Sequence, residues 1–305
     1  MQFRTATLTL AVSLAGACGA AEFRADANLV LINATVLDRH DRPVRGLTRD
    51  RFRLYEDKAE QNIAYFSEED VPLSLAVIFD VSGSMDGKMP GMRAALNAVL
   101  DAANTQDEFS LVTFADQPMI AAGWNPNPDE IQNHLLLHSA HGQTSLLDAL
   151  ETGLASMKTA RNPRKAMLIF SDGGDNHSRA SERHLLRSLE ESGVQIYAVD
   201  TADPLLSRPL SPEEAAGPDL LDRICDRAGG RYFHVDGKRE LASAAQQIAR
   251  ELHSQYLIGY VPASRAPASR TRDGRFHHVR VQVTHPEGTP QVSVFWRRGY
   301  RAPGD

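Results

Sequence analysis

The sequence has few of the features that stabilise small exported proteins or that place a chain in a membrane. Only two cysteines, Cys18 and Cys225, occur in 305 residues, which excludes a framework of several disulfides. Cys225 lies in an apolar segment and is expected to be a buried free thiol. The apolar run at residues 6–17 is too short to span a bilayer. The fold must therefore be held by its hydrophobic core.

An excess of positive charge is also missing. The formal net charge is −6, whereas domains that bind nucleic acid are typically basic. The Arg-rich stretches at 265–275 and 297–301 are short and mixed with Pro or Gly, as expected of loops and chain ends. A hydrophobic content of 42% and a charged content of 24% are those of an ordinary globular protein. At about 150 residues per domain, the length predicts one medium domain and a smaller unit.

Residues 1–21 are typical of an export signal peptide. Arg4 supplies a positive start, a mostly apolar run follows, and small residues continue to Ala21. Cys18 lies where a lipoprotein signal carries its acylated cysteine, but the preceding residues 15–17 lack the usual large aliphatic side chain. We therefore favour plain cleavage near Ala21 over lipid anchoring. The mature chain is then expected in the periplasm, outside the cell or on its surface.

Two segments rich in β-forming residues flank a longer region of mixed character. Residues 22–70 and 254–305 contain strand-like stretches separated by turn residues. Between them, residues 71–253 alternate apolar strands with helical stretches, the pattern of a parallel sheet covered on both faces. Because the ends of a compact domain often lie close together, we expect the two flanking segments to share one antiparallel β domain.

The central region predicts an α/β fold with an open, doubly wound and mainly parallel sheet. Its expected strands are residues 73–79, 108–114, 166–170, 194–199 and 231–234. Its expected helices are residues 89–104, 129–138, 145–159, 182–192, 220–228 and 239–253. In such sheets ligands bind beyond the carboxyl ends of the strands, so a functional site is expected in the residues that follow them.

Polar motifs occur at these positions. The first central strand ends in DVSGSM, where Asp80, Ser82 and Ser84 are two residues apart, so that three oxygen side chains can point the same way. A later strand is followed by SDGGD, which contains Asp172, and a helix is opened by GQTS, which contains Thr144. A DxSxS motif alone is weak evidence, but three concordant motifs are more specific.

In this order and with these intervals, DVSGSM, GQTSLLDAL and IFSDGGD resemble the metal-ion-dependent adhesion site (MIDAS) of von Willebrand factor type A (vWA) domains. The resemblance covers the central region. It implies that Ser82, Ser84 and Thr144 ligate a divalent cation directly, while Asp80 and Asp172 act largely through water. The motifs SQYLIGYVP, DGRFHHVRV and RRGYRAP resemble an exported, vWA-related group of proteins abundant in acidobacteria.

The chemistry of the donor set agrees with this resemblance. Hydroxyl and carboxylate oxygens, without sulfur or imidazole, favour Mg²⁺, Mn²⁺ or Ca²⁺ over zinc. Neutral hydroxyls and water-separated carboxylates neutralise the cation only in part, so that it attracts a carboxylate from a partner. We therefore expect an exported, cation-dependent protein-binding or adhesion module that binds no nucleic acid and has no membrane span in its mature chain.

Three other chemistries have less support. Residues 83–88 have the spacing GxxxGK, one residue shorter than a phosphate-binding loop and without its hydroxyl residue. His134, His138 and His141 share a face of an expected helix, but the leucines between them indicate a solvated or partly buried edge more than a zinc site. No GxSxG motif occurs and no general base accompanies the metal site, so we expect no enzyme activity.

A structural or envelope-assembly role is the alternative function. In that case the cation only stabilises the loops at the carboxyl end of the sheet, and the β domain carries out recognition.

Overall fold

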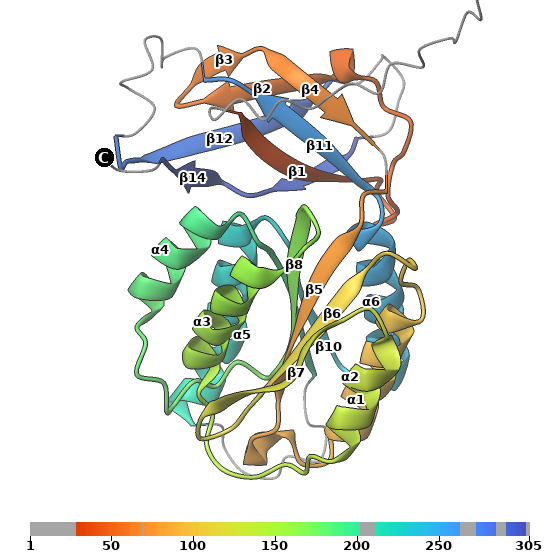
Figure 1. Ribbon diagram of the computed structural model, residues 1–305, viewed down its shortest axis with the longest axis vertical. Helices are drawn as coiled ribbons and strands as arrows, with labels where there is room; N and C mark the ends of the chain where they lie inside the picture. Colours follow the sequence, from red (N-terminus) through yellow and green to blue (C-terminus); the bar gives the residue numbers. More distant parts are fainter. Residues whose placement is uncertain (1–28, 69, 202–210, 263–272, 285–290, 303–305) are drawn as a thin grey trace, which may run out of the picture.

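The computed structural model describes residues 29–68, 70–201, 211–262, 273–284 and 291–302. The predicted export signal and Cys18 lie outside these residues. Within the described segments, no helix combines the length and the apolar character that a membrane crossing requires. The elements form an α/β unit, from β5 to α6, and a β unit built from the segments on either side of it (Figure 1).

A six-stranded sheet forms the centre of the α/β unit. Its strands run parallel except for β7, which pairs antiparallel with β6 at one edge. In sheet order they are β10 (Tyr232–Val235), β9 (Gln195–Thr201), β8 (Arg164–Phe170), β5 (Leu73–Asp80), β6 (Glu108–Phe114) and β7 (Pro118–Asn125). All eight residues of β5 are buried. This confirms the doubly wound, mainly parallel fold predicted from the sequence.

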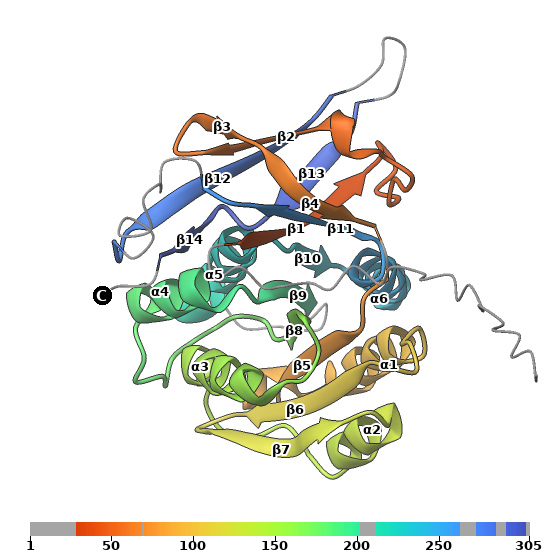
Figure 2. The ribbon, with the colours of Figure 1, turned by 45° about the horizontal axis from the view of Figure 1, so that its top comes forward.

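Helices cover both faces of this sheet (Figure 2). Alternate side chains of each strand reach the two layers, so that Val77 and Phe79 of β5 enter one core while Ala76 and Ile78 enter the other. The helices on the first face are α1 (Met89–Leu100), α2 (Pro128–Leu136) and α6 (Lys238–Leu252). Those on the second face are α3 (Leu146–Ser156), α4 (Glu182–Ser192) and α5 (Pro212–Ala228).

The β unit consists of two four-stranded antiparallel sheets. In both sheets, strands from the N-terminal segment pair with strands from the C-terminal segment. One sheet has the order β13 (Ser293–Trp296), β1 (Val30–Leu37), β11 (Gln255–Tyr260) and β4 (Ile63–Ser67). The other has the order β14 (Gly299–Arg301), β12 (Phe276–Val283), β2 (Phe52–Glu56) and β3 (Ala59–Gln61). The predicted antiparallel β domain built from both flanking segments is thus confirmed.

The β unit lies at the end of the α/β unit where the parallel strands begin (Figure 1). Polar contacts join the two units. Arg231 lies 2.6 Å from the fully buried carboxylate of Glu251 and 3.4 Å from Asp41, which follows β1. On the other side, Arg301 of β14 lies 3.0 Å from Glu190 of α4. The carboxyl ends of the parallel strands, where a ligand site is expected, therefore face away from the β unit.

Two elements of the α/β unit differ from the sequence predictions by more than four residues at an end. The edge strand β7 was not predicted, because Pro118 and Gly123 weaken its strand pattern and its pairing with β6 contains register shifts. Helix α5 begins at Pro212, eight residues before the predicted start. Gly217 and Pro218 inside the helix depress its sequence signal, although Ser211 forms a capping box with Glu214 at its start.

Replacing Leu54 of β2 by Ala tests the core shared by the two β sheets. Leu54 is fully buried in that core, so Leu54→Ala should reduce the free energy of unfolding by about 2–5 kcal/mol. The neighbouring Arg53 forms an exposed ion pair with Glu60, and Arg53→Ala should cost about 1 kcal/mol or less. Urea denaturation of the two variants measures both effects, and equal losses would contradict the assigned core.

Candidate metal centre

The first loop of the predicted site leaves the carboxyl end of β5. Asp80, the last residue of that strand, is completely buried. One of its carboxylate oxygens accepts the backbone N–H of Ser82 at 2.8 Å, and the other accepts the hydroxyl of Ser171 at 2.6 Å. The hydroxyl oxygens of Ser82 and Ser84 lie 3.1 Å apart. Two carboxylate oxygens and two hydroxyls are therefore held within one turn of chain.

The second loop carries Thr144, which is buried just before α3. Its backbone N–H donates to the side-chain oxygen of Asn176 at 2.9 Å, and its carbonyl oxygen accepts the backbone N–H of Asn176 and of His177, each at 3.0 Å. Gly83 of the first loop donates its N–H to the carbonyl oxygen of Gly142 at 3.0 Å. These bonds fix the second loop against both of the others.

The third loop follows β8 and carries Asp172. The side chain of Asp172 is 13% exposed, and its carboxylate lies 3.0 Å from the ammonium group of Lys88, whose side chain is 11% exposed. The loop is joined to the first one because Ser171, the residue before Asp172, donates to Asp80. The ion pair with Lys88 was not predicted from the sequence.

Close backbone packing sets the position of the third loop. Gly173 has a positive φ of 77°, and a Cβ on it would lie 2.6 Å from the carbonyl oxygen of Gly217 in α5. A Cβ on Gly217 would in turn overlap the carbonyl oxygen of Asp172. Because neither glycine has room for a side chain, the backbone of the loop rests directly on the helix.

The electrostatics of the site favour a cation. Burial and, to a smaller extent, the negative charge of Asp172 raise the pKa of Asp80 to about 7, against the hydrogen bonds from Ser171 and Ser82 that lower it. A buried carboxylate that is opposed by a second carboxylate gains when positive charge is placed beside it. The hydroxyls of Ser82, Ser84 and Thr144 add neutral oxygen donors. The residues present thus fit a hard divalent cation.

The structure brings the five predicted ligands to one edge of the sheet, on three loops that hydrogen-bond to one another. Contacts join Ser82 to both Asp80 and Ser84, whereas Thr144 is linked to this group through the backbone of its loop. Three residues that support the site were not predicted to do so: Lys88, Ser171 and Asn176. The side chain of Asn176 accepts the backbone N–H of Thr144 and so joins two loops that are 32 residues apart in the sequence.

A comparison with known protein families identifies the region that carries this site. The matching family model is described as the von Willebrand factor type A domain and covers residues 75–174, from β5 to the third loop. Residues 75–174 match a vWA domain. All five predicted ligands lie within the matched span. No curated protein matches the sequence.

Solved structures of vWA proteins share the fold. A von Willebrand factor type A protein from Catenulispora acidiphila has a TM-score of 0.52 and 13% sequence identity, and the match covers 91% of this chain and 74% of that one. Proximal thread matrix protein 1 from the mussel byssus, with a zinc-occupied MIDAS motif, has a TM-score of 0.52 and 18% identity over 65% of this chain. The present chain spans 49% of the mussel protein's length. At these identities the similarity is one of fold.

The three histidines near the candidate metal centre, His134, His138 and His141, do not share one helix face. Helix α2 ends at Leu136, so His138 and His141 lie in the loop that leads to Thr144. The imidazole of His134 lies 4.0 Å from Glu130, and that of His141 contacts the carbonyl oxygen of Ser139 at 2.8 Å.

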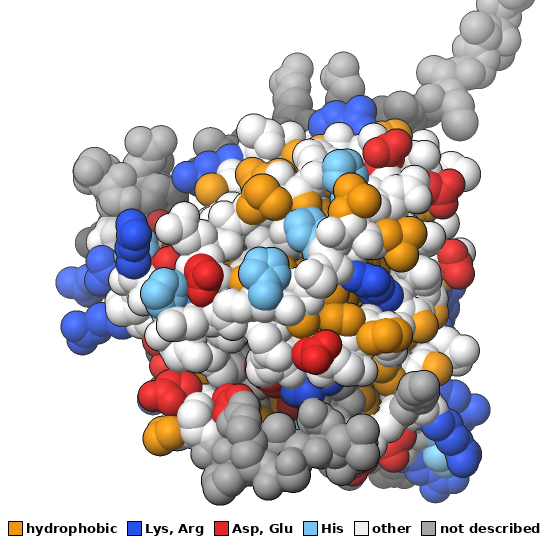
Figure 3. Space-filling view, turned by 90° about the horizontal axis from the view of Figure 1, so that it is seen from below, with side chains coloured by type: hydrophobic (Ala, Val, Ile, Leu, Met, Phe, Trp, Pro, Cys, Tyr) orange, Lys and Arg blue, Asp and Glu red, His pale blue; other side chains and the backbone are white. Residues whose placement is uncertain are grey.

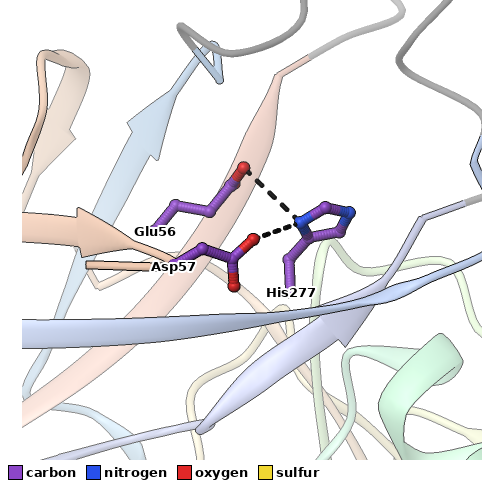
Figure 4. A group of neighbouring side chains, drawn as sticks. All are labelled: Glu56, Asp57 and His277. Carbon is purple, nitrogen blue, oxygen red and sulfur yellow. Dashed lines mark hydrogen bonds and ion pairs between the residues drawn. The ribbon is translucent and has the colours of Figure 1, made fainter. Parts of the chain in front are cut away.

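A second polar cluster, formed by Glu56, Asp57 and His277, lies in the β unit and apart from the candidate metal centre (Figure 4). The Nδ1 atom of His277 lies 2.7 Å from Asp57 and 3.8 Å from Glu56, and its Nε2 atom lies 3.2 Å from Asp273. Two ligands of one tetrahedral zinc ion lie roughly 3.3 Å apart, given bonds of about 2.0–2.1 Å. The 2.7 Å contact is instead a hydrogen-bond distance. We interpret the cluster as a network that fastens the start of β12 to the turn between β2 and β3.

Gly217→Ala tests the packing of the third loop against α5. Alanine is intrinsically better than glycine in a helix by about 1 kcal/mol. Here the new methyl group would collide with the backbone of Asp172, so we expect a net loss of about 1–3 kcal/mol in the free energy of unfolding. Gly91→Ala in α1 is the matched control, because its methyl group would meet only the end of the Leu241 side chain. Denaturation that ranks Gly91→Ala as the more damaging change would contradict the packing.

The raised pKa of Asp80 predicts how the stability of the metal-free protein depends on pH. The folded-state pKa of about 7 lies above the ordinary value of 3.8. The fold therefore gains from protonation of Asp80, fully below about pH 3.8, and this gain is lost as the pH rises through 7. With chelator present, the free energy of unfolding of the parent should fall relative to that of Asp80→Asn between pH 5 and 8. A difference that stays constant over this range in urea titrations would refute the assignment.

Proposed function

We propose that this protein is an exported vWA module that binds a partner protein through a divalent cation. The cation would be held by Asp80, Ser82, Ser84, Thr144 and Asp172, and a carboxylate of the partner would complete its coordination. The proposal rests on three loops that meet at the carboxyl edge of the sheet and hydrogen-bond to one another. Together they carry two carboxylates and three hydroxyls.

Magnesium or manganese is the proposed ion, with calcium as a further possibility for the same donors. All five side chains offer oxygen, which hard cations prefer. The mussel protein carries zinc in its MIDAS motif, but zinc sites are more commonly built from imidazole and thiolate groups. In the proposed role the hydroxyls leave part of the cation's charge unneutralised, and this residual charge attracts the partner's carboxylate.

The surface around the site supports a protein partner. Hydrophobic and histidine side chains gather on the face that carries the carboxyl ends of the strands, while Lys and Arg lie mostly at its edges (Figure 3). Exposed apolar side chains come from the start of β7, Met119 and Ile120, and from the end of α2, Leu136 and Leu137. A carboxylate bound among such side chains would lose water, which strengthens its attraction to the cation.

Export and the absence of catalysis complete the proposal. The predicted signal peptide at residues 1–21 would deliver the chain to the periplasm, the cell surface or the medium, as would membership of the exported vWA-related group that the flanking motifs resemble. No catalytic role is proposed for the site.

A structural or envelope-assembly role is the second candidate. The β unit supports it, because this unit has a hydrophobic core of its own and lies at the end of the molecule opposite the candidate metal centre (Figure 1). Chelation separates the two functions. Lost partner capture with the fold retained, at a moderately lower melting temperature because the bound ion no longer stabilises it, favours the cation-bridged module. A lost fold with metal-insensitive capture favours the structural role.

Asp172→Ala tests the metal site. Loss of this carboxylate should weaken Mg²⁺ or Mn²⁺ binding by about 10- to 100-fold, the usual effect of removing a group that orients a metal through water. Capture of the partner from the envelope fraction should fall in parallel and recover in part with excess Mn²⁺. Asp86→Ala is the matched control, because it removes an exposed carboxylate from the neighbouring loop. If calorimetry gives both variants the parent's affinity, the site is wrong.

A further inference from the structure

One charged side chain at the proposed metal site remains unexplained by metal binding. The ammonium group of Lys88 lies 3.0 Å from an Asp172 carboxylate oxygen, and both side chains are largely buried. Burying a lysine in this way removes most of its hydration and fixes a flexible chain, so its presence requires a compensating interaction. The carboxylate of Asp172 supplies one.

The local structure shows that Lys88 serves the site and not the helix that it precedes. Lys88 is the N-cap residue of α1, and its side chain makes no capping bond. The N-terminus of a helix carries partial positive charge, which disfavours a cation there. Backbone bonds hold the residue firmly, from its N–H to Met85 and from Met92 to its carbonyl oxygen. The side chain therefore reaches across to the third loop because Asp172 attracts it.

We propose that Lys88 is a tethered cation that competes with the divalent ion for Asp172 and so lowers the metal affinity of the site. Lys88 occupies one oxygen of the carboxylate that would orient the ion through water. The two positive charges repel each other, so the ion binds only as the ammonium group leaves Asp172. A single charge close to a carboxylate changes the affinity of that carboxylate for a proton by about 10- to 1000-fold. We expect Lys88 to lower the metal affinity by a factor near the lower end of this range, since water can reach both the Lys88 ammonium group and the Asp172 carboxylate.

This inference rests on the proposed function, because it assumes that the site binds a divalent ion. It adds a specific role to a residue outside the five proposed ligands. A weaker site responds to changes in metal concentration that would leave a tighter one saturated, so Lys88 would set the concentration range over which the partner binds.

The test is titration of Mn²⁺ and Mg²⁺ into the full chain by calorimetry, with melting temperatures measured with and without chelator. Lys88→Met and Lys88→Gln should bind about 10-fold tighter than the parent or more. Their melting temperatures should fall in chelator and rise more steeply with metal than that of the parent. Lys88→Arg, which keeps the charge, should stay close to the parent. Lys158→Met is the control, because it removes an exposed lysine after α3, outside the three loops.

A double substitution tests whether the competition acts through Asp172. In an Asp172→Ala background, Lys88→Met should change metal affinity by less than about twofold, because the shared carboxylate is gone. A full effect in that background would overturn the inference, since Lys88 would then act on the ion by another route.

The outcomes separate this inference from the proposed function. If the parent binds Mn²⁺ and both neutral variants bind it equally or more weakly, the inference is wrong and the metal site stands. If neither the parent nor the neutral variants bind Mn²⁺ or Mg²⁺, the proposed function is wrong and the inference falls with it. Tighter binding by Lys88→Arg, to the level of Lys88→Met, would also overturn the inference because the charge would not matter.

Discussion

The buried carboxylate of Asp80 is the constraint on which the proposed site depends. It ends a strand with no exposed residue, and its two oxygens bind groups from different loops, the N–H of Ser82 and the hydroxyl of Ser171. Since β5 and β8 are adjacent parallel strands, this one side chain joins the two loops that leave them. A charge in such surroundings needs a counter-charge nearby, which a cation in the proposed site would supply.

The β unit joins two segments of the chain that are separated in the sequence by the whole α/β unit. Strand β1 pairs with β11 on one side and β13 on the other, and β2 pairs with β12. Each segment supplies only two strands to each sheet, and a two-stranded piece is marginally stable at best, so each segment depends on the other for its core. The ion pairs of Arg231 with Asp41 and of Arg301 with Glu190 then fix this unit against the α/β unit, at the end opposite the candidate metal centre.

The sequence predicted the parts of the structure that depend on local patterns. The mainly apolar sequence of β5 predicted a strand that is buried on both faces. The spacing of Asp80, Ser82 and Ser84 predicted the first loop of the site. The direction of the Lys88 side chain could not be predicted from the sequence. Residues 83–88 resembled an incomplete phosphate-binding loop, and only the fold brings Asp172 beside Lys88. The contact between Gly173 and Gly217 was likewise hidden, since it joins positions on two elements and leaves no motif. Long-range proximity is the information that a single sequence lacks.

The way the α/β unit is inserted has a mechanical consequence. Its two connections enter β4 and β11, which are neighbouring strands of one sheet, with Ser67 paired to Leu257 near the junction. Tension applied at the carboxyl edge of the parallel sheet would therefore pull both strands in the same direction and share its force between two covalent links. Because neither strand is peeled from the other, the force passes into the sheet as shear between β11 and β1, across a ladder of six residue pairs. A partner bound at the proposed site would therefore load both connections together.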